Sequence, residues 1–461
     1  MTDGEMDEIG QHELDFILNF SDCCPADDDL RRAAKFGIWV FQHGDRGEDQ
    51  ASLPYLREVL ERRTVSRAAL LAFVSGRPEP LVLFEGYFRT RESHVRQVDS
   101  CCFGSAQWCA VACAGLRLGR FDARNGMTPA GDADGGRPLM ASSLVAFMLG
   151  QPIRILASIL RKLFFFDQWN VAVVPGAAEE LLRKSDSRRF EWLRPPSFRK
   201  FHADPFGLLF DGVLHVLVEA FDYIDGRGRI AQIGLENAEM RAEFLTGIDS
   251  GSHMSYPYIV AFDGEILCVP ETSAAGDVGL YRAVEFPHRW ELAATLIKGF
   301  PAVDSTLFEY GGLWWLLCGR RGELSEVELY AWHATSPWGP WTPHPLNPVK
   351  CDVRSSRPAG TPFMVDGSLC RPAQDCSRTY GGAIAVSRIV KLSPTAFEEE
   401  LIGRIEPDPT GPYRHGLHTV CSMDGMTIVD GKRRRFHPAA PALKAWAVVA
   451  SRKGRRTRPL P

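Results

Sequence analysis

The sequence predicts a mainly β fold, in which a five-bladed β-propeller follows a smaller α/β domain. Tight-turn dipeptides flanked by apolar runs recur along the C-terminal part of the chain, at intervals of 52, 48, 55 and 58 residues. The composition of 42 Gly, 31 Pro, 27 Phe and 11 Trp favours turns and aromatic-rich strands over a helical bundle. A length of 461 residues allows two or three domains with substantial cores.

Residues 1–121 are predicted to form the smaller α/β domain, because apolar runs of strand length alternate there with helical spacing. The expected strands are Leu14–Phe20, Phe36–Phe41, Ala68–Val74 and Pro80–Phe84, and the expected helices are Pro54–Arg63 and 94–116. Residues 122–167 are predicted to hold a linker and an amphipathic helix. The linker is residues 122–138, which are rich in Gly, Asp and Pro and show no periodicity.

No membrane span is expected, because charged residues and a proline interrupt the longest apolar stretch, Leu139–Phe166. Its second half, Ile153–Phe166, is interpreted as an amphipathic helix that packs on another domain, with weak contact with a membrane surface as the alternative. Residues 1–29 hold ten acids and no Lys or Arg, unlike a secretory leader. The 12 cysteines show no C-x-x-C spacing and are read as reduced thiols, which predicts a cytoplasmic protein without a metal site.

Residues 168–450 are predicted to form the propeller, and residues 451–461 a solvated basic tail. The turn dipeptides are Asp211-Gly212, Asp263-Gly264, Gly311-Gly312, Asp366-Gly367 and Asp424-Gly425. A two-residue hairpin turn of the primed type needs positive φ at its central residues, which Gly and Asp tolerate. A hairpin that recurs about every 50 residues is typical of one blade of a radial β array. A chance recurrence in a β-sandwich is the alternative.

Counting outward from these turns predicts a cluster of acids. Asp204, Tyr256 and Asp304 each stand seven residues before their turn, and their expected cross-strand partners are Glu219, Glu271 and Gly319. If the first strand of each hairpin lines a central shaft, Asp204 and Asp304 point into one funnel with Glu271 at its mouth. Hydrolysis or transfer of a glycosyl group needs one ionised and one protonated carboxyl group. The alternative is that acids at strand ends lie in water or cap turns.

Further polar side chains are candidates for binding a substrate near these acids, because arginine forks and histidines bind carboxylate, phosphate or sugar hydroxyl groups. An alternative is that some of them make structural pairs, such as Arg371 with Asp375. The near balance of 53 Lys+Arg against 57 Asp+Glu gives no reason to expect a nucleic-acid partner. The candidates are His202, Tyr256, Arg357, Arg371, Asp375, Arg378, Tyr380 and His418.

The stretches FHADPF, YPYIVAFDGEILCVPETS, SSRPAGTPF, RPAQDCSRTYGGAI and GLHTVCSMDG carry a resemblance over roughly residues 165–440. Together they resemble the N-terminal domain of the plant glucosamine inositolphosphorylceramide transferases and their bacterial relatives, a domain similar to five-bladed arabinanase and furanosidase propellers. The resemblance implies a carbohydrate-related role, with Asp204 as the first-blade base or nucleophile and Asp304 as the pKa modulator or stabiliser. Glu271 is the best remaining acid. The transferase activity of the plant enzyme belongs to a separate domain, so the resemblance does not confer it.

The N-terminal domain resembles an incomplete formyltransferase fold. LDFILNFS is similar to the strand before that family's catalytic loop, and FQHGDRGEDQASLPYLREVL to the loop and the helix after it. His43 fits the family's histidine, and Phe41 replaces its asparagine. Asp45 is kept with His43 as a candidate remnant of the site, although it lies too near His43 to match the family's catalytic aspartate. Formyl-tetrahydrofolate is implied as a cofactor only if this domain is active; otherwise we expect none.

Three functions follow as hypotheses. The first is a carbohydrate-active enzyme that works through Asp204, Glu271 and Asp304 on a glycan, a glycolipid head group or a sugar nucleotide. The second is a non-catalytic glycan-binding or scaffold module. The third is formyl transfer to an amino sugar through His43. In each case the expected partner is a sugar-containing small molecule, and the oligomeric state is left open.

Overall fold

The computed structural model describes residues 9, 11–20, 28–44, 53–119, 141–183, 190–236, 239–423 and 425–446. These divide into two compact units, each described here by itself. The N-terminal unit holds residues 1–149 with 345–352, and the C-terminal unit holds residues 150–344 with 353–461. Asp45, Asp424, the expected linker 122–138 and the expected tail 451–461 lie outside the described residues.

The N-terminal unit combines helices with a mixed sheet. The sheet order is β1–β2–β3–β4–β19; β1–β2 and β4–β19 pair in parallel, and β2–β3 and β3–β4 pair antiparallel. The strands are β1 (Ile17–Asn19), β2 (Ile38–His43), β3 (Val65–Phe73), β4 (Leu81–Arg89) and β19 (Lys350–Asp352). The helices are α2 (Asp28–Arg32), α3 (Leu56–Glu61), α4 (His94–Ser105) and α5 (Trp108–Arg117). The likeness to a formyltransferase stays a prediction.

Two expectations for the N-terminal unit were wrong. The run Leu14–Phe20 is not a buried strand, because only Ile17–Asn19 form a strand, with all three residues half-buried, and Leu14 makes an isolated bridge with Ala34. The reason is that β1 is an edge strand with β2 on one side only. The expected helix 94–116 is two helices, α4 and α5, separated at Ala106 and Gln107. The fully buried Trp108 at the start of α5 packs against Phe84 of β4, with ring centroids 5.0 Å apart.

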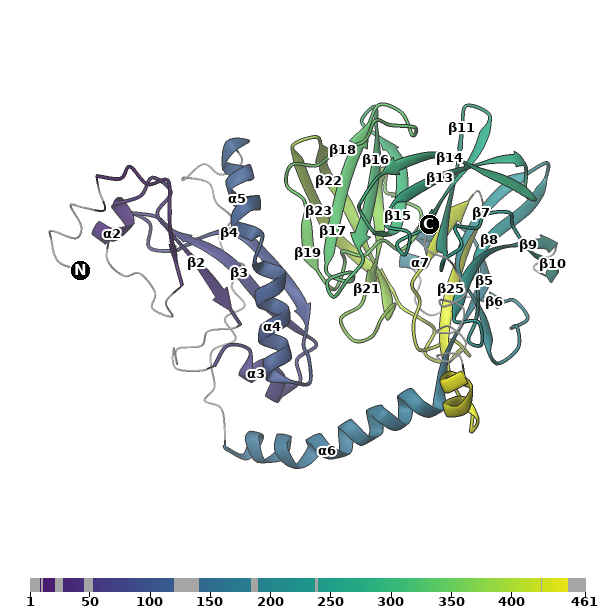
Figure 1. The fold of residues 1–461 in the computed structure, drawn as a ribbon, viewed down its shortest axis with the longest axis horizontal. Helices are drawn as coiled ribbons and strands as arrows, with labels where there is room; N and C mark the ends of the chain where they lie inside the picture. The colour runs from purple at the N-terminus through teal and green to yellow at the C-terminus, as the bar shows by residue number, and fades with distance from the viewer. Residues whose placement is uncertain are drawn as a thin grey trace, which may run out of the picture. The chain divides into compact units, whose positions relative to one another are not determined.

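The C-terminal unit is built from antiparallel sheets arranged like the blades of a propeller (Figure 1). Among the described residues, four separate four-stranded sheets have the orders β10–β9–β8–β7, β11–β12–β13–β14, β20–β21–β22–β23 and β24–β25–β5–β6. Strands β15–β16–β17–β18 make a further antiparallel run that is not counted as a separate sheet. The mainly β fold with propeller-like sheets is therefore confirmed, and the expected count of five blades is not.

The strands of this unit follow one another with short connections. They are β5 (Phe165–Pro175), β6 (Glu191–Trp192), β7 (Lys200–Phe210), β8 (Val213–Asp222), β9 (Arg227–Glu236), β10 (Glu239–Leu245), β11 (Ser255–Phe262), β12 (Glu265–Glu271), β13 (Val278–Glu285), β14 (Arg289–Ile297), β15 (Ala302–Tyr310), β16 (Leu313–Arg320), β17 (Glu328–Ala334), β18 (Thr342–Pro343), β20 (Phe363–Val365), β21 (Ser368–Asp375), β22 (Ala383–Ser393), β23 (Ala396–Ile405), β24 (Val420–Met423) and β25 (Met426–Phe436). The unit also holds α7 (Ala178–Arg183), helical residues 440–446, and the part of α6 (Ala141–Phe164) from Gly150 onward.

The hairpin turns have the conformation that the sequence predicts. Asp211 and Gly212 have φ of 50° and 77°, and Asp263 and Gly264 have φ of 51° and 76°. The flanking residues pair directly across each turn, as Phe210 does with Val213. Both central residues are in the left-handed region, so these are primed turns that suit the twist of the strands.

One sheet is closed by strands from the two ends of the C-terminal unit. β25 pairs with β5 along its whole length, from Met426 opposite Pro175 to Phe436 opposite Phe165. The first strand of the unit thus completes a sheet with the last two. This pairing was not part of the sequence prediction, and it brings residues near position 170 beside residues near position 430.

The core of the C-terminal unit lies between adjacent sheets. One cluster joins Phe206 of β7, Tyr256 and Tyr258 of β11 and Leu307 of β15, all of them buried. β11 contacts both β7 and β15, so the first strands of successive hairpins lie side by side. Polar residues at one end of these first strands are therefore brought together, as the expected funnel requires.

Candidate functional site

A β-bulge recurs at the same place in three hairpins and sets the positions of the acids. Asp204, Tyr256 and Asp304 are the bulged residues, with φ of 51°, 45° and 53°. The left-handed conformation costs a residue other than glycine about 1–2 kcal/mol, so each bulge needs compensating contacts. Strain of this kind concentrates at functional sites.

Because of the bulge, the observed cross-strand register differs from the predicted register by one residue. Glu219 lies opposite Ala203, and Glu271 lies opposite Ser255, rather than opposite Asp204 and Tyr256. Gly319 is likewise opposite the residue before Asp304. The prediction assumed an unbroken ladder, whereas two residues on the bulged strand oppose one residue on the partner strand.

Asp204 is buried, and its carboxylate is held by its neighbours. Its Oδ2 accepts a hydrogen bond from the Tyr256 backbone N–H at 3.2 Å, and its Oδ1 accepts one from the Thr419 hydroxyl at 3.0 Å. His418 Nε2 lies 3.4 Å from the same Oδ1. Asp204 is thus fixed by residues from a neighbouring hairpin and from the loop before β24, which tie three parts of the chain together.

His418 is clamped between two carboxylates. Its Nδ1 lies 2.6 Å from Oδ2 of the fully buried Asp430 on β25. Asp430 Oδ1 also accepts the backbone N–H groups of His418 and Thr419, at 3.1 and 3.0 Å. The His418 ring stacks on Trp169 of β5 with centroids 3.8 Å apart. Burial by itself disfavours the charged ring, but Asp430 and Asp204 outweigh it and raise the pKa of His418.

Asp304 is paired with Arg357. The guanidinium donates from Nε to Asp304 Oδ2 at 2.6 Å and from Nη2 to Oδ1 at 3.3 Å, which is a bidentate pair. The amide of the fully buried Gln374 donates to Asp304 Oδ2 at 2.9 Å. Arg357 also lies over the ring of Tyr380, 5.1 Å from its centroid. These contacts fix the direction of the Arg357 side chain.

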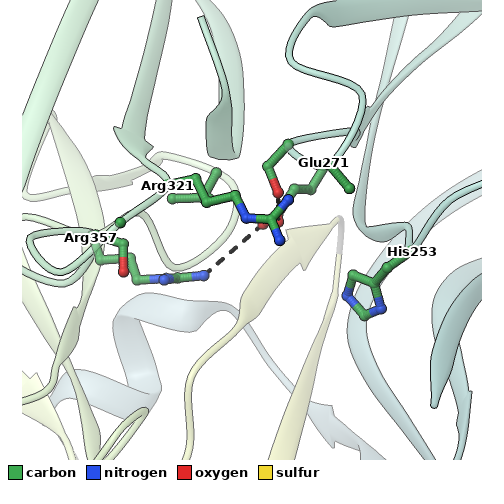
Figure 2. A pocket seen from close by; sticks show the side chains of 9 residues that line it. His253, Glu271, Arg321 and Arg357 are labelled. Carbon is green, nitrogen blue, oxygen red and sulfur yellow. Dashed lines mark hydrogen bonds and ion pairs between the residues drawn. The ribbon is translucent and has the colours of Figure 1, made fainter. Parts of the chain in front are cut away.

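Glu271 and Arg357 line a pocket of about 500 Å³. The Ser273 hydroxyl donates to Glu271 Oε1 at 2.7 Å, and Arg357 Nη2 forms an ion pair with Glu271 Oε2 at 3.9 Å. Figure 2 shows Arg357 pointing toward Glu271, with His253 on the far side of that carboxylate. The exposed Arg321 also lines the pocket. The pocket thus offers one carboxylate, two guanidinium groups and an imidazole to a ligand.

Burial and mutual repulsion change the charge balance of the cluster. Burial, opposed by the nearby His418, raises the pKa of Asp204 to about 6. Burial, opposed by Arg357, likewise raises the pKa of Asp304 to about 6. The pKa of Glu219 is raised well above its usual value by burial and then by the surrounding carboxylates. Carboxyl groups with raised pKa values therefore lie beside Glu271, which lines the pocket.

Several predicted substrate-binding residues have structural partners elsewhere. Arg371 is buried, pairs with Glu399 at 2.6 Å and donates to the carbonyls of Ser355 and Ser356. Asp375 accepts from Ser377 and from Arg404, so the alternative Arg371 with Asp375 pair is wrong.

Three more of the predicted residues do not line the 500 Å³ pocket. The Tyr256 hydroxyl exchanges a hydrogen bond with Thr306 at 2.8 Å and accepts the Gly360 N–H at 2.7 Å, which braces the bulge. His202 is buried and lines a separate cavity of about 150 Å³. Arg378 is exposed.

Sequence reasoning did not select three residues that the structure brings into this cluster. They are Asp430 and Thr419, which contact His418 and Asp204, and Trp169, which stacks on His418. Asp430 had a signal in the sequence, since it is a lone acid inside the apolar strand MTIVDG. An acid in a buried strand needs a partner, and that requirement could have marked it.

Asp204, His418 and Asp430 together offer ligand atoms within 4.8 Å of one another, as a bound cation would require. The nitrogen and oxygen donors suit Zn²⁺ or another divalent metal. In this structure the three side chains contact one another and the Thr419 hydroxyl. They are the part of the described chain best suited to hold a metal.

The N-terminal unit holds the other predicted site residue within the described ranges, His43. Its Nδ1 shares a hydrogen bond of 2.8 Å with the hydroxyl of the buried Tyr55, and its Nε2 lies 3.9 Å from the Cys102 thiol. Burial raises the pKa of Cys102, so this thiol is not activated as a thiolate. Formyl transfer by His43 stays a prediction.

Comparisons with known proteins bear on the C-terminal unit. Residues 195–407 match the family model described as glucosamine inositolphosphorylceramide transferase 1, N-terminal. The chain is 36% identical over 205 residues to glucosamine inositolphosphorylceramide transferase 1 of Oryza sativa subsp. japonica, and 35% identical to that of Arabidopsis thaliana. Each match covers 43% of this chain and 27% of the relative, so the chain spans about a quarter of the length of these relatives.

Solved structures of glycoside hydrolases also match, at low identity. A family 117 glycoside hydrolase from Zobellia galactanivorans has 13% identity and a TM-score of 0.37, covering 57% of this chain and 90% of the other. An exo-β-1,3-galactanase from Phanerochaete chrysosporium has 9% identity and a TM-score of 0.36, covering 47% and 53%. The sequence matches agree with the family that the motifs suggested, because residues 195–407 match the model of the glucosamine inositolphosphorylceramide transferase N-terminal domain.

Proposed function

We propose that the C-terminal unit is a carbohydrate-active propeller that binds a sugar-containing molecule in the pocket above Glu271 and Arg357 and acts on its glycosyl bond. The observation that carries this proposal is the ion pair of Arg357 with both Asp304 and Glu271, at 2.6 and 3.9 Å. It places a buried carboxyl group with a raised pKa behind a carboxylate that lines a pocket of about 500 Å³.

The chemistry follows from the two kinds of carboxyl group. Glycosyl hydrolysis or transfer needs one carboxyl group that donates a proton and one that is ionised. Glu271 is the group that touches the substrate, and Arg357 orients it. Asp304 is a positioning residue that fixes Arg357. Asp204, held by His418 and Thr419, adds a second carboxyl group whose pKa of about 6 suits proton exchange near neutral pH.

The substrate class we propose is a sugar-containing lipid head group that carries a phosphate. Arg321, Arg357 and His253 line the pocket and give it the donors that bind a phosphate oxygen. The names of the matching relatives contain inositolphosphorylceramide, a lipid whose head group carries a phosphate. We further propose that β15–β18 form the fifth blade, since their antiparallel order matches that of the four separate sheets.

A non-catalytic binding module is the second candidate, and a specific observation favours it. Asp204 and Asp304 are 5% and 3% exposed, and neither lines the pocket. A molecule seated above Glu271 therefore meets one carboxylate rather than two. In that case the buried acids serve to hold Arg357 and the bulges, and the propeller recognises its ligand without cleaving it.

The test is a set of matched carboxamide variants of the full chain. Glu271→Gln and Asp204→Asn are compared with Glu309→Gln, an exposed residue beside a hairpin turn. Calorimetry with glucosamine and with myo-inositol phosphate measures binding, and a panel of aryl glycosides measures turnover. We expect Glu271→Gln to lose turnover by about a hundredfold or more, and Glu309→Gln to match the parent.

The outcomes separate the two candidates. Turnover that falls in Glu271→Gln and Asp204→Asn supports the enzyme. Saturable binding that weakens in Glu271→Gln, with no turnover by the parent, supports the binding module. Binding and turnover that are both unchanged in Glu271→Gln would rule out the proposed site.

A further inference from the structure

Helix α6 presents a continuous apolar face to its surroundings. From Val145 to Leu163, nine apolar side chains are at least 42% exposed. Met148, Leu149 and Ile153 are 70%, 72% and 71% exposed. Exposed apolar surface of this extent on one element marks an interaction site rather than scattered surface residues.

The apolar and polar side chains of α6 are separated into two faces. At 100° per residue, the nine exposed apolar side chains fall within an arc of about 160°. Gln151, Arg154, Ser158, Arg161 and Lys162 occupy the opposite side. The helix contains three basic residues and no acid in its 24 residues. Its polar face therefore carries positive charge only.

Exposed aromatic side chains also lie near the C-terminal end of the helix, where the ring of Phe436 stacks on Phe164 with centroids 6.2 Å apart. The ammonium group of Lys444 donates to the carbonyls of Lys162 and Phe165, both at 2.6 Å, which fixes residues 440–446 against this end. Trp446, two residues further on, is 64% exposed, and Phe436 is 58% exposed. Exposed aromatic rings beside basic residues are typical of a membrane–water interface.

We propose that α6 lies flat on the surface of a lipid bilayer that contains anionic lipids. The apolar face is buried among the acyl chains, and Arg154, Arg161 and Lys162 reach the negatively charged head groups. No helix among the described residues is long and apolar enough to cross a membrane. Arg154, Arg161 and Lys162 lie together on one side of α6, and such a basic stripe opposite an apolar face suits a helix at a bilayer surface. This proposal does not rest on the proposed sugar chemistry.

The charge of α6 favours lipid over a second copy of the chain as the occupant. Two α6 helices packed through their apolar faces leave Arg154, Arg161 and Lys162 of each helix on the outer sides, and neither helix carries an acid to pair with them. An anionic lipid surface covers the apolar face and also attracts each basic residue. The observations therefore favour lipid.

The test is co-sedimentation of the full chain with vesicles of phosphatidylcholine alone or mixed with phosphatidylserine. The apolar variant is L149S/I153S/L156S. Its matched control is L209S/L292S/V390S, which removes three side chains that are 66%, 58% and 56% exposed on the sheets. The charge variant is R154Q/R161Q/K162Q. Circular dichroism checks that each variant folds.

We expect the parent and the matched control to pellet with phosphatidylserine vesicles. The apolar and charge variants should each bind about tenfold or more weakly, and added salt should weaken the parent. Equal pelleting of the parent and the apolar variant would overturn the proposal. So would a concentration-dependent dimer that the apolar variant abolishes, in the absence of vesicle binding. Absence of both pelleting and dimer formation would also overturn it. Vesicle binding that persists in Glu271→Gln separates this proposal from the sugar site.

Discussion

Replacing Arg357 by methionine tests the electrostatic design of the site most directly. Arg357 is 9% exposed and Asp304 is 3% exposed, so water cannot take the place of either partner when the other is removed. The change removes hydrogen bonds of 2.6 and 3.3 Å to Asp304 and keeps most of the side-chain volume. Asp304 then retains the hydrogen bond from Gln374, but its buried charge has lost its counter-ion.

Removing one partner of a buried ion pair costs about 3–5 kcal/mol of unfolding free energy at neutral pH. The loss should depend on pH, because the pKa of Asp304 is already raised to about 6 and rises further without Arg357. At pH 5 the carboxyl group is largely protonated, and we expect the loss to shrink to about 1–2 kcal/mol, the size of the missing hydrogen bonds. The double variant R357M/D304N should regain about half of the loss or more at neutral pH.

Urea unfolding at pH 7.5 and pH 5, followed by tryptophan fluorescence, measures both quantities. Arg229→Met is the control, because it removes a half-exposed pair with Asp225 at 2.8 Å, and we expect it to cost less than about 1 kcal/mol. A loss in Arg357→Met that is no greater than the control's, or one that is the same at both pH values, would refute the reasoning.

Two further predictions concern the same framework. The unfolding free energy of the parent should fall as the pH rises from about 4 to above 6, because Asp204 and Asp304 hold their protons more tightly in the folded state than in the unfolded state. Each of the two groups contributes at most about 3 kcal/mol to this fall. His418, whose pKa is also raised, acts in the same direction. Stability in urea that is flat or rising over this range would contradict it. Gly360→Ala should lower the unfolding free energy by more than about 2 kcal/mol, because the φ of Gly360 is +114° and a Cβ there meets the Val420 carbonyl oxygen at 1.9 Å. Gly276→Ala should lower it by only about 1–2 kcal/mol, because Gly276 has a φ of +86° but a Cβ there meets open space. Thermal melts of the two alanine variants check this order, and equal melting temperatures would refute it.

The hairpins of the propeller could be predicted from the sequence because their determinants are local. A primed two-residue turn needs positive φ at both positions, and Asp-Gly and Gly-Gly dipeptides with apolar flanks satisfy that need within about ten residues. The same periodicity brought Asp204, Glu271 and Asp304 forward as candidates. The motifs around them also indicated the family whose model matches residues 195–407.

The positions and partners of the site residues depend on contacts that the hairpin turns do not determine. The bulges at Asp204 and Asp304 depend on which residue the partner strand offers, and turn counting cannot detect them. Trp169 stacks on His418 only because β5 pairs with β25, more than 250 residues later in the chain. Arg357 could be named from the sequence, but its bidentate pair with Asp304 and its place in the pocket required the assembled sheets. Turn geometry is fixed by the φ preferences of two residues, whereas the pKa of a buried acid is fixed by whichever charges the whole fold packs around it.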